Sequence, residues 1–187
     1  KPYSEYRILN HWANLDDTVE RGYAGLSMWE WTAKEIPAKR IHHYGELCAS
    51  VGLNGAVLNN VNANPLILDK EHIERVAQIA NILREYGITT YLSIKWTSPI
   101  TLDGLKSGDP LDPKVRQWWK NKASEIYAAI PDFGGFLVKA NSEGQAGPQD
   151  YGRTHADGAN MLAEAVAPYG GIIMWRAFVY SPSSSDR

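Results

Sequence analysis

Two hydrophobic spacings alternate along the chain. Short runs rich in apolar residues, typical of buried strands, recur at 6–12, 55–62, 89–96, 135–139 and 172–180. Between them lie longer stretches with apolar residues three and four positions apart, at 37–51, 70–86, 113–130 and 154–167. That spacing is typical of helices that bury one face. The chain therefore predicts a strand, loop and helix repeated along its length, ending on a fifth strand.

Helix boundaries carry recognisable end residues. Pro37 suits a first helical turn, and Asp69 and the pair Asp112-Pro113 are good N-terminal caps for the next two helices. Thr154, followed three residues later by Asp157, resembles a capping box for the fourth helix. The first helix is expected to bury Ile41, Tyr44, Leu47, Cys48 and Val51.

Strands that alternate with helices of this length predict a parallel sheet with right-handed crossovers. Two architectures fit: a doubly wound sheet and part of a (β/α)8 barrel. The barrel is favoured because no Gly-rich phosphate turn follows the first strand and because the strands end in polar or aromatic residues. We expect an α/β fold with about five parallel strands and four helices of a TIM barrel. Since a closed barrel needs about eight strands, residues 1–187 are predicted to be its N-terminal part, truncated from a longer chain.

Composition limits the kinds of partner that this protein can be expected to bind. A net charge of −2 and the absence of a basic run give no support for nucleic acid, and no stretch suggests a membrane span or a signal peptide. Cys48 is the single cysteine, so no internal disulfide can form and cysteine content does not indicate the cellular compartment. The seven tryptophans are numerous, and four of them are interpreted as packing residues: Trp29, Trp31, Trp118 and Trp119. The pair His42-His43 is not expected to bind a metal, because adjacent helical residues diverge.

The fourth strand carries the strongest candidate chemistry. If strand alternation continues past its apolar part, Lys139, Asn141 and Glu143 share one face. A cation, an amide and a carboxyl group at the end of a buried strand need a use or a partner. The alternative to a functional site is a core Lys–Glu ion pair that only fixes strand packing.

Five segments together resemble the α-glucuronidases of glycoside hydrolase family 67. They are 9–16 (LNHWANLD), 27–31 (SMWEW), 59–63 (NNVNA), 139–148 (KANSEGQAGP) and 174–180 (MWRAFVY). The resemblance implies a central catalytic barrel that removes α-1,2-linked (4-O-methyl)glucuronic acid from glucuronoxylan-derived xylo-oligosaccharides, with inversion. It also implies no cofactor or metal, and an intracellular or cell-envelope location in a xylan-degrading microbe.

The resemblance also assigns roles. Glu143 matches the general acid, which at neutral pH needs a raised pKa. Lys139 and Arg176 match the residues that bind the substrate carboxylate, and Trp12 and Val61 match the apolar sheath around the 4-O-methyl group. Asn141 is expected to orient Glu143 or a sugar hydroxyl. Asn60, Lys95 and Trp96 are weaker candidates for sugar binding.

No general base is identified. The base candidates of the family lie on later strands, and four carboxylates here do not match them: Asp150, Asp157, Glu164 and Asp186. The alternative hypotheses are a catalytically incomplete sugar-binding or scaffold module, and a sugar isomerase. An isomerase would want a cluster of acids and histidines for a metal at the strand ends, which the sequence does not show. The open strand edges predict that the rest of the barrel or a second copy covers them.

Overall fold

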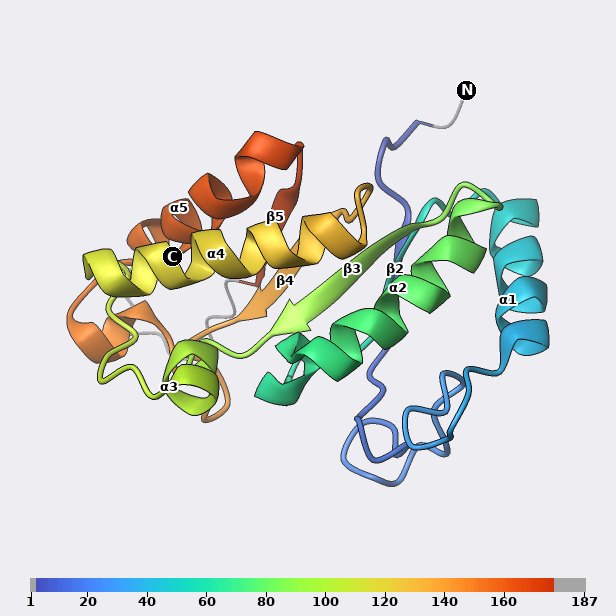
Figure 1. Ribbon diagram of the computed structural model, residues 1–187, viewed down its shortest axis with the longest axis horizontal. Coiled ribbons are helices and arrows are strands. Elements are labelled where there is room, and N and C mark those ends of the chain that lie inside the picture. The colour runs from blue at the N-terminus through green and yellow to red at the C-terminus, as the bar shows by residue number, and fades with distance from the viewer. Residues whose placement is uncertain (1–2, 177–187) are drawn as a thin grey trace.

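A computed structural model describes residues 3–176 and contains one five-stranded parallel sheet (Figure 1). The strands are β1 (Ile8–Asn10), β2 (Gly55–Val57), β3 (Thr89–Ile94), β4 (Gly135–Lys139) and β5 (Ile172–Arg176). Their order in the sheet is their order in the chain, and every neighbouring pair is parallel. The predicted topology is confirmed.

Four long helices connect the strands as predicted: α1 (Ala38–Ser50), α2 (Lys70–Arg84), α4 (Pro113–Ala129) and α5 (His155–Val166). A short helix, α3 (Ser98–Asp103), was not predicted, nor were the 3-10 turns η1 (Pro65–Leu68), η2 (Pro148–Tyr151) and η3 (Ala167–Tyr169). The caps are confirmed. Asp69 and Asp112 each accept a hydrogen bond from a first-turn backbone N–H, and Thr154 with Asp157 forms a capping box.

The two faces of the sheet differ. On one face, alternate strand residues such as Leu92, Phe136 and Val138 pack against the helices in a large apolar core. On the other face, Val57, Tyr91 and Leu137 belong to a small separate cluster to which the helices contribute nothing. A doubly wound sheet would carry helices on both faces. Helices on a single face of a curled parallel sheet identify a partial barrel, with the small cluster facing its interior.

Two glycines allow neighbouring elements to pack closely: one between β4 and β5, and one between α5 and the tryptophans beneath it. Gly135 begins β4 at φ +124°, and a Cβ there would lie 1.9 Å from the Ile172 carbonyl oxygen of β5. On α5, a Cβ at Gly158 would lie 2.8 Å from Trp96 and 2.9 Å from Trp175. A side chain at either position would push a neighbouring element away.

The first three strands are shorter than predicted, and the first helix buries a different set of residues. Residues 177–180, predicted to continue the fifth strand, lie outside the described residues. Leu47 and Val51 are exposed, whereas Ile41, Gly45 and Cys48 are buried. The reason is position: α1 is the end helix of the row and has α2 beside it on one side only (Figure 1). The packing role of the four tryptophans is confirmed, with Trp29, Trp31 and Trp119 buried and Trp118 packed against the core.

Candidate active site

Two cations lie at the carboxyl ends of neighbouring strands. Lys139 is the last residue of β4 and Arg176 the last residue of β5, and the two are register partners. Register partners on adjacent strands point to the same face. Both share the parity of Leu137 and Met174, which belong to or pack on the interior cluster. The two cations therefore lie at the mouth of the interior face.

Lys139 is almost fully buried, with 1% of its side chain exposed. Its Nζ donates to Asn62 Oδ1 at 3.0 Å and forms an ion pair with the carboxylate of Glu143. A buried ammonium group needs such acceptors to offset its lost hydration. Glu143 provides the exposed half of the pair, since 42% of its side chain remains in solvent.

Glu143 reaches Lys139 by a turn and not by strand alternation. The strand ends at Lys139, and both Asn141 (φ 48°) and Glu143 (φ 47°) adopt left-handed conformations. Ser142 and Gln145 close the turn with an isolated antiparallel bridge. The prediction that these residues lie near one another is correct for Lys139 and Glu143, but its stated reason, an extended strand, is wrong.

The protonation state of Glu143 also differs from expectation. The hydrogen bond from Lys139 and its charge hold the pKa of the Glu143 carboxyl below its ordinary value, and Arg21 and Arg176 add smaller effects in the same direction. The sequence predicted a raised pKa. A carboxylate paired with a cation is ionised at neutral pH, so in this state Glu143 has no proton to donate.

An aromatic side chain joins this group from the far edge of the sheet. The Arg176 guanidinium carbon lies 5.7 Å from the centroid of the Trp12 ring, a distance that suits a cation–π contact. Trp12 follows β1 and Arg176 ends β5, so the contact requires the strong curvature of the sheet. Trp12 also packs on the interior cluster that contains buried Val61. The structure thus brings both predicted sheath residues and both predicted cations to one face.

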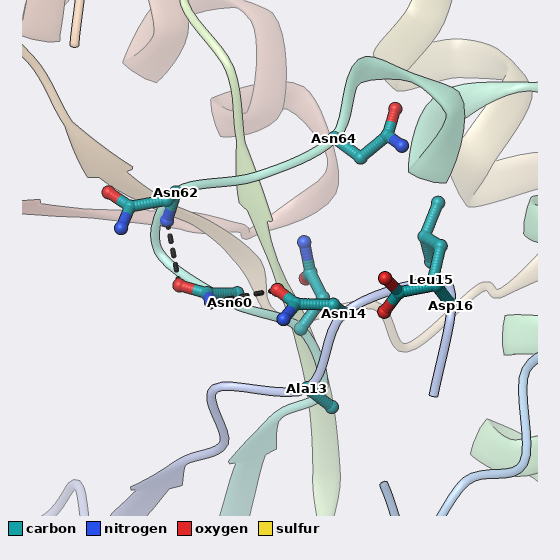
Figure 2. A pocket seen from close by; sticks show the side chains of 8 residues that line it. Ala13, Asn14, Leu15, Asp16, Asn60, Asn62 and Asn64 are labelled. Carbon is teal, nitrogen blue, oxygen red and sulfur yellow. Dashed lines mark hydrogen bonds between the residues drawn. The ribbon is translucent and has the colours of Figure 1, made fainter. Parts of the chain in front are cut away.

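A polar pocket adjoins Lys139 (Figure 2). It has a volume of about 250 Å³ and lies between the loop after β1 and the segment after β2. Its lining is Ala13, Asn14, Leu15, Asp16, Asn59, Asn60, Asn62 and Asn64. Asn62 lines this pocket and also accepts the hydrogen bond from Lys139 Nζ. It therefore connects the pocket to the Lys139–Glu143 pair.

Asn60 serves as the frame of the pocket. Its Nδ2 donates to Asn14 Oδ1 at 2.8 Å, and its Oδ1 accepts from the Asn62 backbone N–H (Figure 2). The same Nδ2 also donates to the Glu20 carbonyl oxygen at 3.0 Å. These bonds tie the loop after β1 to the end of β2. Asn60 is buried, so its contribution to the site is through the positions of Asn14 and Asn62.

Comparison with known proteins gives the context of this geometry. The model of the glycosyl hydrolase family 67 middle domain matches residues 1–187. The chain belongs to that family. Among curated relatives, it is 48% identical over 180 residues to the probable alpha-glucuronidase A of Aspergillus terreus, covering 96% of this chain and 21% of that protein. It is 48% identical over 185 residues to alpha-glucuronidase A of Emericella nidulans, covering 96% of this chain and 22% of that protein.

The family 67 chain thus spans about a fifth of the length of these curated relatives. A solved GH5_18 protein from Bifidobacterium longum has a TM-score of 0.50 and 11% sequence identity, over 91% of this chain and 44% of that one. A variant of that protein in complex with Manb1-4GlcNAc has a TM-score of 0.51 and 10% identity, over 90% of this chain and 43% of that one. At this identity the likeness shows the barrel fold alone. No helix among the described residues is long and apolar enough to cross a membrane.

The remaining candidates in this family 67 domain differ in their contacts. Asn141 Oδ1 accepts from the Gln149 backbone N–H at 2.9 Å and so supports η2. Trp96 faces the helices: it is buried in the large core and its Nε1 donates to the Gly108 carbonyl oxygen. Lys95, partly buried, follows the end of β3. His42 contacts the Tyr86 hydroxyl at 3.0 Å, and His43 lies on the exposed part of α1.

The described carboxylates that were weighed as a base are held by other contacts. Asp150 accepts from the Gly147 backbone N–H, Asp157 caps α5, and Glu164 pairs with Arg116. Asp186 lies outside the described residues. The sequence predicted no role for Asn62 or Arg21, which contact or influence the Lys139–Glu143 pair. Asn62 could have been found from the run of asparagines at the end of the second predicted strand, whereas no pattern marked Arg21.

Proposed function

We propose that this domain serves a glycoside hydrolase that removes α-1,2-linked (4-O-methyl)glucuronic acid from xylo-oligosaccharides with inversion. The observation that carries the proposal is the buried cation Lys139, with Arg176 at its side and the carboxyl group of Glu143 against it. Fixed cations suit a sugar that bears a carboxylate. Membership of family 67 and the names of the curated relatives support the same activity.

Glu143 is proposed as the general acid. Inverting hydrolysis needs one carboxylic acid to protonate the glycosidic oxygen and one carboxylate to activate water on the opposite face of the sugar. Glu143 lies at the mouth of the barrel interior and is partly exposed, so a leaving oxygen can approach it. Its position next to Lys139 places the protonation step beside the proposed carboxylate contact.

Arg176 and Lys139 are proposed to hold the uronic acid carboxylate. Arg176 can offer two parallel N–H groups, while Lys139 adds a buried point charge. Trp12 and Val61, which the structure places on the same face, are proposed as the apolar sheath of the 4-O-methyl group. The amides of Asn60 and Asn141 are proposed to act on the sugar indirectly, through the segments that they hold in place.

The base is proposed to come from polypeptide outside residues 1–187. The described Asp150, Asp157 and Glu164 are each held by another contact: a backbone N–H, a helix cap and an ion pair with Arg116. The carboxylates of an inverting pair lie roughly 6.5–9.5 Å apart across the sugar. We propose that the chain is the N-terminal part of the barrel, and that the remaining strands or a second copy complete its walls.

The alternative is a catalytically incomplete segment that acts only as a sugar-binding or scaffold module. The ionised state of Glu143 favours this alternative, because an acid without a proton cannot assist departure of the leaving group. The two functions differ in turnover. A binding module would retain glucuronate without releasing it from an oligosaccharide.

The test uses the full-length protein and 4-O-methylglucuronic acid-bearing xylo-oligosaccharides. We expect release of the uronic acid, first seen by proton NMR as the inverted anomer, and no reaction with undecorated xylo-oligosaccharides. Residues 1–187 expressed alone are expected to give no turnover. Binding without release by the full-length protein would support the module, and turnover by a purified monomer of residues 1–187 would place a base within this segment.

A further inference from the structure

We propose that Glu143 occupies the carboxylate position of Lys139 while the site is free of substrate, and that a uronic acid carboxylate displaces it there. Once displaced, Glu143 takes up a proton from water and becomes the acid that the reaction requires. This inference rests on the proposed function, because it names what the substrate carboxylate does at the same site.

The contacts of Lys139 show an occupied carboxylate site. The ammonium group is buried and presents three N–H donors, of which one goes to Asn62 Oδ1 and one to the Glu143 carboxylate. Asn62 is fixed by its backbone N–H to Asn60. Glu143 is the partner that can leave, since its side chain is 42% exposed and enters from a surface turn.

The turn that carries Glu143 has an unusual backbone conformation. Asn141 and Glu143 hold positive φ values, a conformation that non-glycine residues seldom adopt. Gly144 follows at φ +78°, and a Cβ built there would meet no other atom within 4 Å. The Ser142–Gln145 bridge and the hydrogen bond to Asn141 Oδ1 hold the backbone of the turn. The exposed side chain of Glu143 is held by its ion pair with Lys139, and it can rotate into solvent when that pair is replaced.

The charges around Glu143 explain why displacement changes its protonation. Lys139 from β4, Arg21 from the loop after β1 and Arg176 from β5 all favour its ionised form. Three acids on that loop have partners of their own: Glu20 pairs with Arg21 at 2.7 Å, Asp16 accepts from Thr18, and Asp17 accepts from the Trp31 and Thr32 backbone N–H groups. A substrate carboxylate on Lys139 and Arg176 would neutralise the two strand cations and bring a like charge close to Glu143. Both changes favour the neutral carboxylic acid.

The proton balance is simple. Binding exchanges one carboxylate for another on Lys139 and transfers one proton from water or buffer to Glu143. The chemical step then passes that proton to the leaving glycosidic oxygen, and the carboxylate of Glu143 can return to Lys139 after the product departs. A neutral sugar lacks the group that displaces Glu143, so the acid would stay ionised in its presence.

Calorimetric titration of the full-length protein with D-glucuronate tests the inference. Titrations near neutral pH in phosphate and in Tris, which differ in ionisation enthalpy, report the protons taken up per ligand bound. We expect net uptake of up to one proton per ligand bound, and an affinity that falls as the pH rises, by at most tenfold per pH unit. Glu143→Gln should abolish proton uptake, make the affinity independent of pH, and bind glucuronate at least as tightly as the wild type.

Two controls locate the effect. Glu20→Gln removes the same charge from the neighbouring loop without touching Lys139, and it should keep the proton uptake. Titration with glucose should show none. Proton uptake that persists in Glu143→Gln, or measurable glucuronate binding without proton uptake, would overturn the displacement while leaving the proposed hydrolase intact. Failure to bind glucuronate together with failure to release it from oligosaccharides would overturn both.

Discussion

The two faces of this sheet differ in composition and in what covers them. The helix-covered face is closed and apolar: Phe136, Val138 and Leu92 are fully buried beneath the helices. The interior face starts with a small apolar cluster and ends in Lys139 and Arg176. Alternate residues of the same strand, such as Val138 and Lys139, therefore have unrelated tasks.

Within the five residues of β4, those on the helix side contribute to stability and Lys139 on the interior face contributes to the site. Apolar burial on the helix side holds the strands in register, and that rigidity lets the interior face keep a buried cation at a defined point. Substitutions on the helix side should change the free energy of unfolding. Substitutions at the end of the interior face should change activity and ligand binding with little effect on unfolding.

The largest expected effect on the interior face is that of Glu143→Ala in the full-length protein. Loss of a general acid should reduce cleavage of natural xylo-oligosaccharides about 10²–10⁴-fold. Substrates with a good leaving group, which need no protonation, should lose much less. Steady-state rates with both substrate types provide the measurement, and an equal loss for the two would rule out the acid role.

On the helix side, Trp119→Ala should be the most destabilising of these changes. Trp119 is fully buried and lies edge-on to Phe136, with 6.0 Å between ring centroids. The cavity should cost about 3–5 kcal/mol, seen as faster amide exchange of α4 and β4 in the full-length protein. Trp119→Phe should cost less. If the folded fraction of either variant showed a changed KM, the two faces would not be independent.

A pH dependence should come from the helix-covered side, where His11 follows β1 and packs against α1. Burial lowers the pKa of His11 from 6.5 to about 4, and its ring contacts the Tyr44 hydroxyl at 2.7 Å. Because the folded form resists protonation, stability should be complete above about pH 6.5 and decline as the pH falls toward 4. The loss should approach about 3 kcal/mol. Amide exchange of α1 against pH tests this, and His11→Gln should flatten the curve.

Arg176→Ala should weaken glucuronate binding by about 1.5–3 kcal/mol, the usual range for hydrogen bonds to a charged group. Glucose binding should change far less, so the ratio of the two affinities gives the measurement. Arg176→Lys is the matched variant, because it keeps the charge but loses the paired N–H groups. Its affinity for glucuronate should lie between those of the wild type and Arg176→Ala. Equal losses for glucose and glucuronate would contradict the carboxylate role.

The smallest effect belongs to a helix end remote from the interior face. Asp112 accepts the Lys114 backbone N–H at 2.8 Å, and Asp112→Ala should destabilise α4 by about 1 kcal/mol. Asp112→Asn should retain most of the cap. Thermal unfolding of the full-length protein gives the comparison, with unchanged kcat expected for both. An altered kcat would show that the helix layer controls the site.

Local interactions explain why much of the fold could be predicted from the sequence. A cap such as Asp69 or Asp112 acts within its own first turn, and the spacing of apolar residues marks the buried side of α2 and α4 directly. Parallel pairing in chain order follows from the alternation of strands and helices. The grouping of Lys139, Arg176 and Trp12 at one end followed from their places at the strand ends.

Contacts between distant segments decided the rest. Lys139 meets Asn62 across 77 residues of chain, and Trp12 meets Arg176 only because the sheet curls. The exposure of Leu47 depends on α1 being the last helix of the row. The state of Glu143 depends on a turn with positive φ values that returns its carboxylate to Lys139. Residue types and spacing determine which groups are present, but the pKa of a group is set by the neighbours that the tertiary structure places beside it.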